Sequence, residues 1–147
     1  MLLCCKLYIS ESRNLSALEA IEQAAKQDPE SVLVNKFEDR AYNRVRYTIV
    51  SYVVHDSTGN AIYSPLHQTV MVMAEAAFGA INIEQHSGTH PRIGVVDDIL
   101  FHPLGRASLD EAAWLAKAVA ADIGSRFQGW YKIFSPLPCI TNIKFLE

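Results

Sequence analysis

The spacing of apolar residues changes repeatedly along this chain, and the order of those changes limits the folds open to it. The composition of strands is found in four short β-branched and aromatic runs, residues 2–9, 31–37, 45–54 and 95–101. Apolar residues at helical intervals are found in three longer segments, residues 18–25, 66–81 and 112–123. The order strand, helix, strand, strand, helix, strand, helix predicts an α+β fold. We expect a ferredoxin-like split βαβ sandwich, a mostly antiparallel or mixed sheet with helices on one face.

Local signals indicate where the helices begin. Ser16 and Glu19 have the spacing of a capping box, as do Ser108 and Glu111, and Pro65 suits the first position of a helix. Residues 129–147 have no helical period. They predict at most one further strand, around residues 130–134, which two prolines would keep short.

Composition narrows the class of protein. With 147 residues, half of them hydrophobic, the chain can bury one core and is expected to form one domain. The formal net charge is −3 and the 13 Lys and Arg are scattered, which argues against a nucleic-acid partner. The sequence offers no membrane span and no signal peptide. An odd count of three cysteines, two of them adjacent, makes a disulfide framework improbable and favours a reducing, cytoplasmic location.

Residues 86–104, "HSGTHPRIGVVDDILFHPL", hold three of the five histidines. A metal site is one interpretation, because His86 and His90 are four residues apart. Gly88 and Pro91 argue against the continuous helix that would align them, and the segment has neither a cysteine nor the glutamate of an HExxH motif. Asp97 and Asp98 are adjacent in a predicted strand and would point to opposite faces. We therefore expect no metal.

The histidines differ in what surrounds them. His102 leaves a predicted strand and is interpreted as structural, bonding a loop carbonyl, while His55 and His67 are interpreted as surface residues. For His86, structural and functional interpretations remain equally open. His90 lies beside a proline and two residues from a guanidinium on a glycine-flanked loop, which suits binding an anion while moving a proton.

At these residues the chain resembles a known family. "HSGTHPRIGVVD", residues 86–97, is similar to the H-x-G-x-H-P-R-[MIL]-G-x-x-D signature of the formiminotransferase N-terminal subdomain. "YISE" at residues 8–11, "YNRVRYTIV" at residues 42–50 and the positions of the helices fit the same family. The resemblance covers about residues 3–128, which we assign to one domain, leaving residues 129–147 as a divergent C-terminal tail.

The resemblance implies a transferase of one-carbon metabolism and histidine catabolism. Such enzymes move the formimino group of N-formiminoglutamate onto N5 of tetrahydrofolate, which is a substrate here. The histidine before Pro-Arg, His90, would be catalytic and would take up the N5 proton. The other residues implied to bind substrate or folate are Arg92, His86, Gly94, Asn43, Arg44 and Asp39. For Asn43 and Arg44 a structural role is equally open.

The sequence also departs from the family. Asn35 and Phe37 align where family enzymes commonly carry aspartates, so an acidic group is either lost or displaced to Glu38 or Asp39. The family's "KGE" between the histidines is "SGT" here. After Gln128 the family continues into a second subdomain, with folate bound between the halves, whereas this chain has "GWYKIFSPLPCITNIKFLE".

These departures predict a truncated or alternatively spliced form that is incomplete as an isolated enzyme. A non-catalytic interaction or regulatory module that retains the fold is the alternative function. A homodimer, or the missing second subdomain, would then cover the cleft face, to which Trp130, Tyr131 and Phe134 would add apolar surface.

Overall fold

The computed structural model describes residues 1–81, 94–127, 130–137 and 140–146. Within these ranges the chain forms a six-stranded sheet, a separate two-stranded hairpin and three helices. The sheet strands are β1 (Leu2–Ile9), β2 (Val32–Asp39), β3 (Arg44–Tyr52), β6 (Val96–Leu104), β7 (Trp130–Leu137) and β8 (Ile140–Leu146). The hairpin strands are β4 (Val54–His55) and β5 (Ala61–Tyr63), and the helices are α1 (Leu15–Ala25), α2 (Pro65–Ala80) and α3 (Leu109–Phe127).

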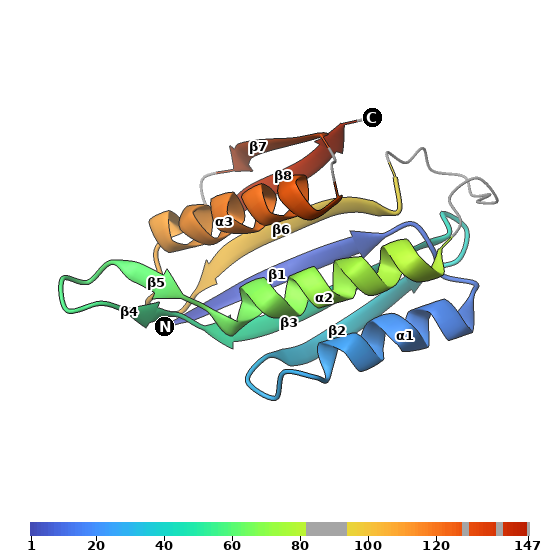
Figure 1. The fold of residues 1–147 in the computed structure, drawn as a ribbon, viewed down its shortest axis with the longest axis horizontal. Coiled ribbons are helices and arrows are strands. Elements are labelled where there is room, and N and C mark those ends of the chain that lie inside the picture. The colour runs from blue at the N-terminus through green and yellow to red at the C-terminus, as the bar shows by residue number, and fades with distance from the viewer. Residues whose placement is uncertain (82–93, 128–129, 138–139, 147) are drawn as a thin grey trace.

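The strand order in the sheet is β2-β3-β1-β6-β8-β7, with every neighbouring pair antiparallel (Figure 1). The predicted α+β class with a mostly antiparallel sheet is thereby confirmed. Strands β8 and β7 extend the sheet on the β6 side, beyond the four strands of the predicted split βαβ unit. The expected strand at residues 130–134 is present as β7 and reaches Leu137, so the prolines do not keep it as short as expected. The limit of one further strand was wrong, because β8 follows it. The register of β7 against β8 shifts between Phe134 and Leu137, where Pro136 cannot donate a backbone hydrogen bond.

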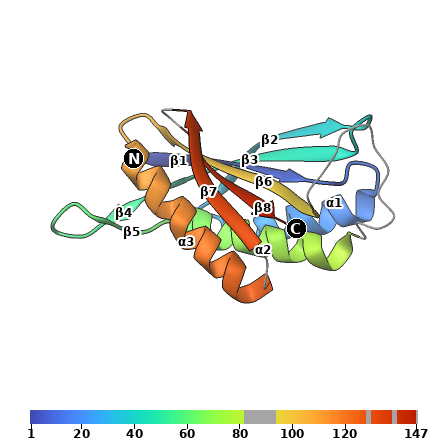
Figure 2. The same cartoon turned by 90° about the horizontal axis from the view of Figure 1, so that it is seen from above.

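All three helices lie on one side of the sheet, as expected (Figure 2). In β1 the alternate residues Leu3, Cys5, Leu7 and Ile9 are fully buried beneath them, whereas Lys6 and Tyr8 are half-buried on the opposite face. The helical stripes predicted from the sequence meet these strand residues in a single core. The same alternation in β3 and β6 gives the sheet a covered face and an open face, the open face being the one that no described helix covers.

The helix starts agree only in part with the sequence signals. Ser108 and Glu111 form the expected capping box: the Glu111 amide donates to Ser108 Oγ at 3.3 Å and the Ser108 amide to Glu111 Oε1 at 3.0 Å. Pro65 opens α2. The capping box assigned to Ser16 is wrong, because Asn14 caps α1 by accepting from the Ala17 amide at 3.2 Å. Asn is at least as good an N-cap as Ser, and here it stands one residue before the first helical position.

Two further expectations concern the cysteines and the membrane. Cys4 and Cys5 are free and buried, and desolvation raises the pKa of both thiols, which disfavours the reactive thiolate form. In the described part of the chain, no helix combines the length and apolar character needed to cross a bilayer.

The difference between the two faces can be tested on neighbouring residues of β6. Ile99 is fully buried under the helices and Leu100 is half-buried on the open face. Ile99→Ala should lower the free energy of unfolding by about 2–5 kcal/mol, because it leaves a cavity in the core. Leu100→Ala removes carbon atoms from a partly solvated side chain and should cost less than half as much. Urea unfolding curves of the two variants measure this difference, and equal losses would contradict the assignment of faces.

Candidate functional site

The site begins at a β-bulge near the end of β1. The β1–β6 register is regular up to the pair Tyr8–Asp98, after which Ile9 pairs with Val96. Asp97 is therefore the extra residue on β6, and a bulge of this kind turns a side chain away from its usual face. Asp97 is buried, with only 7% of its side chain exposed. A carboxylate in such a place needs a cationic partner or hydrogen-bond donors.

The cation is Arg44, the first residue of β3. Its Nη2 lies 3.3 Å from Asp97 Oδ2, and its guanidinium stacks on the Tyr8 ring with 4.2 Å to the ring centroid. Charge pairing and stacking together hold the guanidinium in place. Arg44 belongs to the motif "YNRVRYTIV" and Asp97 is the last residue of "HSGTHPRIGVVD". An ion pair therefore joins two segments that both resemble the family.

The turn before Arg44 is built around Asn43. This residue has a left-handed φ of 54°, a conformation that Asn tolerates better than most residues. Its Oδ1 accepts from the Ser12 amide at 2.8 Å, and Ser12 Oγ lies 3.3 Å from the same atom. Asn43 is buried and directed at the loop after β1. Of the two roles left open for it, this geometry favours the structural one.

Hydrogen bonds join the C-terminal end of the signature to the residue that follows β1, at the same corner of the sheet as the Arg44–Asp97 pair. The Ser10 amide donates to the Val95 carbonyl at 2.9 Å, and Ser10 Oγ donates to the Gly94 carbonyl at 2.7 Å. Gly94 therefore contributes its backbone to the site. His86, His90 and Arg92 lie outside the described residues.

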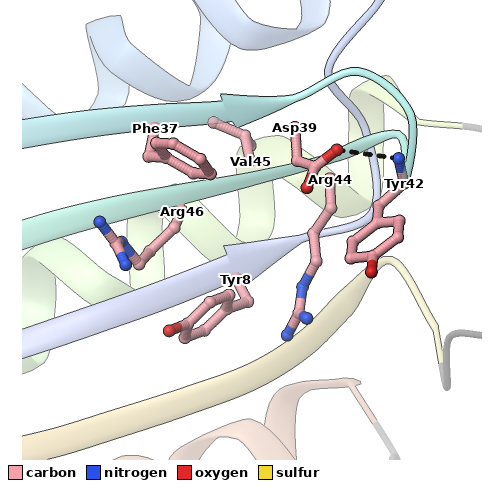
Figure 3. Close-up of a pocket in the computed structure, with 7 residues that line it drawn as sticks. All are labelled: Tyr8, Phe37, Asp39, Tyr42, Arg44, Val45 and Arg46. Atoms are coloured by element: carbon pink, nitrogen blue, oxygen red, sulfur yellow. Dashed lines mark hydrogen bonds between the residues drawn. The ribbon is translucent and has the colours of Figure 1, made fainter. Parts of the chain in front are cut away.

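Next to this corner the open face contains a hollow of about 170 Å³. Figure 3 shows its lining: three aromatic side chains, three charged side chains and one valine, from β1, β2, β3 and the turn between β2 and β3. The residues are Tyr8, Phe37, Asp39, Tyr42, Arg44, Val45 and Arg46. Aromatic surface with a few charged groups is typical of small-molecule sites.

The structure distinguishes the two acidic candidates in β2. Asp39 lines the hollow, and its Oδ1 accepts from the Tyr42 amide at 3.0 Å. Glu38 lies instead beside Lys36 at 3.1 Å, and Lys36 also contacts Glu22 of α1 at 2.9 Å, on the covered side of the sheet. If an acidic group of the family site is displaced in this chain, Asp39 is the residue placed to supply it. Phe37 shares the hollow with Asp39.

Arg46 is a lining residue that the sequence reasoning missed. Its guanidinium carbon lies 5.3 Å from the centroid of the Phe37 ring. The available signal was the period of two along β3, since Arg44 and Arg46 share a face of any strand that contains both.

The remaining described histidines do not line the hollow. His102 was expected to leave the strand but lies within β6. Burial lowers its pKa, although a backbone hydrogen bond at Pro103 opposes that shift. His55 and His67 were expected to be surface residues, but each is partly buried against α3. His55 Nε2 lies 3.0 Å from Glu111 Oε2, and His67 Nε2 lies 3.0 Å from Asp122 Oδ2. Among the described residues, no three His, Cys, Asp or Glu side chains gather as a metal site would require.

Comparison with known proteins includes both motifs in a single match. Residues 2–134 match the formiminotransferase domain, N-terminal subdomain. The chain is 52% identical over 125 residues to a formiminotransferase cyclodeaminase-like protein of Arabidopsis thaliana. The aligned region covers 85% of this chain and 40% of that protein. The chain is 32% identical over 114 residues to the formimidoyltransferase-cyclodeaminase of Rattus norvegicus, covering 78% of this chain and 19% of the relative. The glutamate formimidoyltransferase of Streptococcus pyogenes serotype M1 is 27% identical over 114 residues, covering 78% and 35%.

A match over almost the whole chain defines the class of protein: an N-terminal subdomain of the formiminotransferase type. This chain belongs to the formiminotransferase family. It spans less than half the length of these three relatives. The match continues past residue 128, and the division into residues 1–128 and 129–147 remains a prediction.

The Arg44–Asp97 pair predicts a specific pattern of stabilities. Arg44→Met takes a cationic partner away from a buried carboxylate and should lower the free energy of unfolding by about 3 kcal/mol. Adding Asp97→Asn removes the charge that was left behind, so the double variant should be more stable than Arg44→Met alone. Chemical denaturation of the two single variants and the double variant gives the coupling energy. Additive losses would mean that the two side chains do not act as a pair.

Proposed function

We propose that this chain forms the first half of a formiminotransferase-type site, in which its open sheet face is one wall of a folate cleft. The reaction is formimino transfer from N-formiminoglutamate to tetrahydrofolate. The observation that carries the proposal is the Arg44–Asp97 ion pair, which holds two family-like motifs together beside a hollow of mixed aromatic and charged character. Family membership supports the same assignment.

The chemistry asks for one proton acceptor and for anion binding. N5 of the folate attacks the formimino carbon, and the bond between that carbon and the glutamate nitrogen breaks. The N5 proton passes to a base, and the departing glutamate amine takes up a proton. Histidine suits both transfers, since its unperturbed pKa lies near neutrality, and we assign this role to His90 in its neutral form. Arg92 would hold a substrate carboxylate in a planar fork.

The wall described here is half of a cleft. A hollow of about 170 Å³ is smaller than the roughly 300–1,000 Å³ typical of small-molecule sites. A second subdomain, or a second copy of the chain, would close it. The relatives are long enough to supply the former, because this chain covers 40% or less of each. We therefore propose weak folate binding by the chain alone and transfer only in the closed assembly.

A non-catalytic interaction module is the second candidate, and Phe37 is the residue that favours it. Phe37 stands where the family is expected to carry an aspartate; the residue is 54% exposed and lines the hollow. An exposed ring on a sheet face suits contact with another protein surface as well as with a ligand.

Titration with tetrahydrofolate separates the two candidates. The chain should bind it in the millimolar to high-micromolar range, because one wall desolvates only part of a pterin ring system. Isothermal titration calorimetry and the shift of the thermal midpoint measure the binding. An absence of both signals at millimolar tetrahydrofolate would favour the interaction module.

The catalytic role of His90 can be tested by joining this chain to the remaining part of the Arabidopsis relative. His90→Ala should lower the rate of N-formiminoglutamate consumption by about two to four orders of magnitude, the usual loss for a positioned acid or base. His86→Ala is the matched control and should cost much less. If His90→Ala kept the parent rate while the joined protein remained active, His90 would not be the base.

A further inference from the structure

Arg46 is a cation for which the described structure supplies no anion. Its neighbours Arg44 and Lys36 lie within 4 Å of carboxylates, Asp97 for the first and Glu22 and Glu38 for the second. No carboxylate of the described residues comes that close to Arg46, and its Nε is buried without a hydrogen-bond acceptor. A buried donor left without an acceptor costs about 1–3 kcal/mol. The anion that the described residues do not supply to this guanidinium would have to come from a ligand in the hollow that Arg46 lines.

The neighbours of Arg46 across the sheet are aromatic. In the sheet register Arg46 is the partner of Phe37 in β2 on one side and of Tyr8 in β1 on the other. The Phe37 ring lies 5.3 Å from the guanidinium carbon, whereas the Tyr8 ring is occupied by the Arg44 guanidinium. Phe37 is more than half exposed, so part of its surface remains available. Figure 3 shows the Arg46 guanidinium and the Phe37 ring together at one end of the hollow.

The two ends of the hollow differ in charge. Asp39 and the Arg44–Asp97 pair lie towards the β2–β3 turn, and Arg46 lies two residues further along β3. A ligand anion is repelled by Asp39 and attracted by Arg46, so its carboxylate belongs at the Arg46 end. The guanidinium offers such a group two parallel hydrogen bonds, and the adjacent ring offers a stacking surface.

We propose that Phe37 and Arg46 form a subsite for an aryl-linked carboxylate, the anionic benzoylglutamate end of a folate-class ligand. This assignment rests on the proposed function and specifies which end of the ligand the hollow receives. Its volume of about 170 Å³ suits one ring and a carboxylate rather than a whole ligand. Arg46 fixes the carboxylate and Phe37 contacts the ring.

The experiment uses p-aminobenzoyl-L-glutamate as the probe and N-acetyl-L-glutamate as its counterpart without a ring. Binding to the full chain is followed by calorimetry or by chemical-shift changes up to about 10 mM. Arg46→Gln should weaken p-aminobenzoyl-L-glutamate binding at least tenfold, the loss for a hydrogen bond to a charged group. The affinity of Arg46→Lys should lie between those of the parent chain and Arg46→Gln, because a point charge replaces the planar guanidinium fork.

Two controls are needed. The first tests whether any nearby positive charge would serve as well as Arg46, and the second tests whether the Phe37 ring contributes to binding. Arg40→Gln removes one positive charge from a side chain that is 75% exposed and near the same turn, and it should leave the affinity unchanged. Phe37→Leu should weaken the aryl probe and leave N-acetyl-L-glutamate unaffected. Equal binding of both probes by the parent chain would overturn the role of Phe37. No binding of the aryl probe at 10 mM, or the same affinity in Arg46→Gln, would overturn the subsite.

Tetrahydrofolate distinguishes failure of the subsite from failure of the proposed function. If tetrahydrofolate binds equally well to the parent and to Arg46→Gln, the subsite is wrong, and the proposal that the open sheet face binds folate is retained. If the aryl probe binds through Arg46 while tetrahydrofolate does not bind, the subsite stands and the folate assignment is wrong.

Discussion

The hydrogen bonding of β1 on both of its edges organises the rest of the structure. β1 pairs along its length with β3 on one side and β6 on the other, so its residues alternate between a face that three helices bury and a face that they do not. Every described residue of the candidate site depends on that frame. Tyr8 comes from β1 itself, Arg44 and Arg46 come from β3, and the bulge that exposes Asp97 to Arg44 is a defect in the β1–β6 pairing.

Much of the fold could be predicted because it depends on local periodicity. The stripes through Leu18, Val70 and Val119 identified all three helices, and the β-branched runs identified the strands of the central sheet. The helix cap at Asn14 was missed because Ser16 offered a competing signal two residues later, and only the chain geometry decides between them. The pairing of β8 with β6 was also beyond the sequence, since it is a choice of partner rather than of local conformation.

The candidate site, like the fold, was predictable where it depends on local sequence and not where it depends on the pairing of distant segments. Motif resemblance was sufficient to single out Asn43, Arg44 and Gly94, which the structure brings to one corner of the sheet. For the acidic group it left Glu38 and Asp39 as alternatives, and of these Asp39 lines the hollow. It could not choose between the two roles of Asn43, because that choice depends on the geometry of the β2–β3 turn. It could not choose Asp39 over Glu38, because that choice depends on which face of β2 each side chain takes. The lack of an acidic partner for Arg46 among the described residues is likewise a property of the register between three strands. Physical neighbours that are distant in sequence leave no local signature.

The central position of β1 also has a consequence for how the chain folds. Its two partner strands begin at Arg44 and Val96, so the middle of the sheet is completed by residues separated by most of the chain. Contacts of such long range slow folding, because a large loop must close before they form. During synthesis β1 and β3 are made well before β6, and the free edge of β1 then exposes unpaired backbone groups beside an apolar run. The period between synthesis of β3 and of β6 is therefore the stage at which this chain is most vulnerable to aggregation.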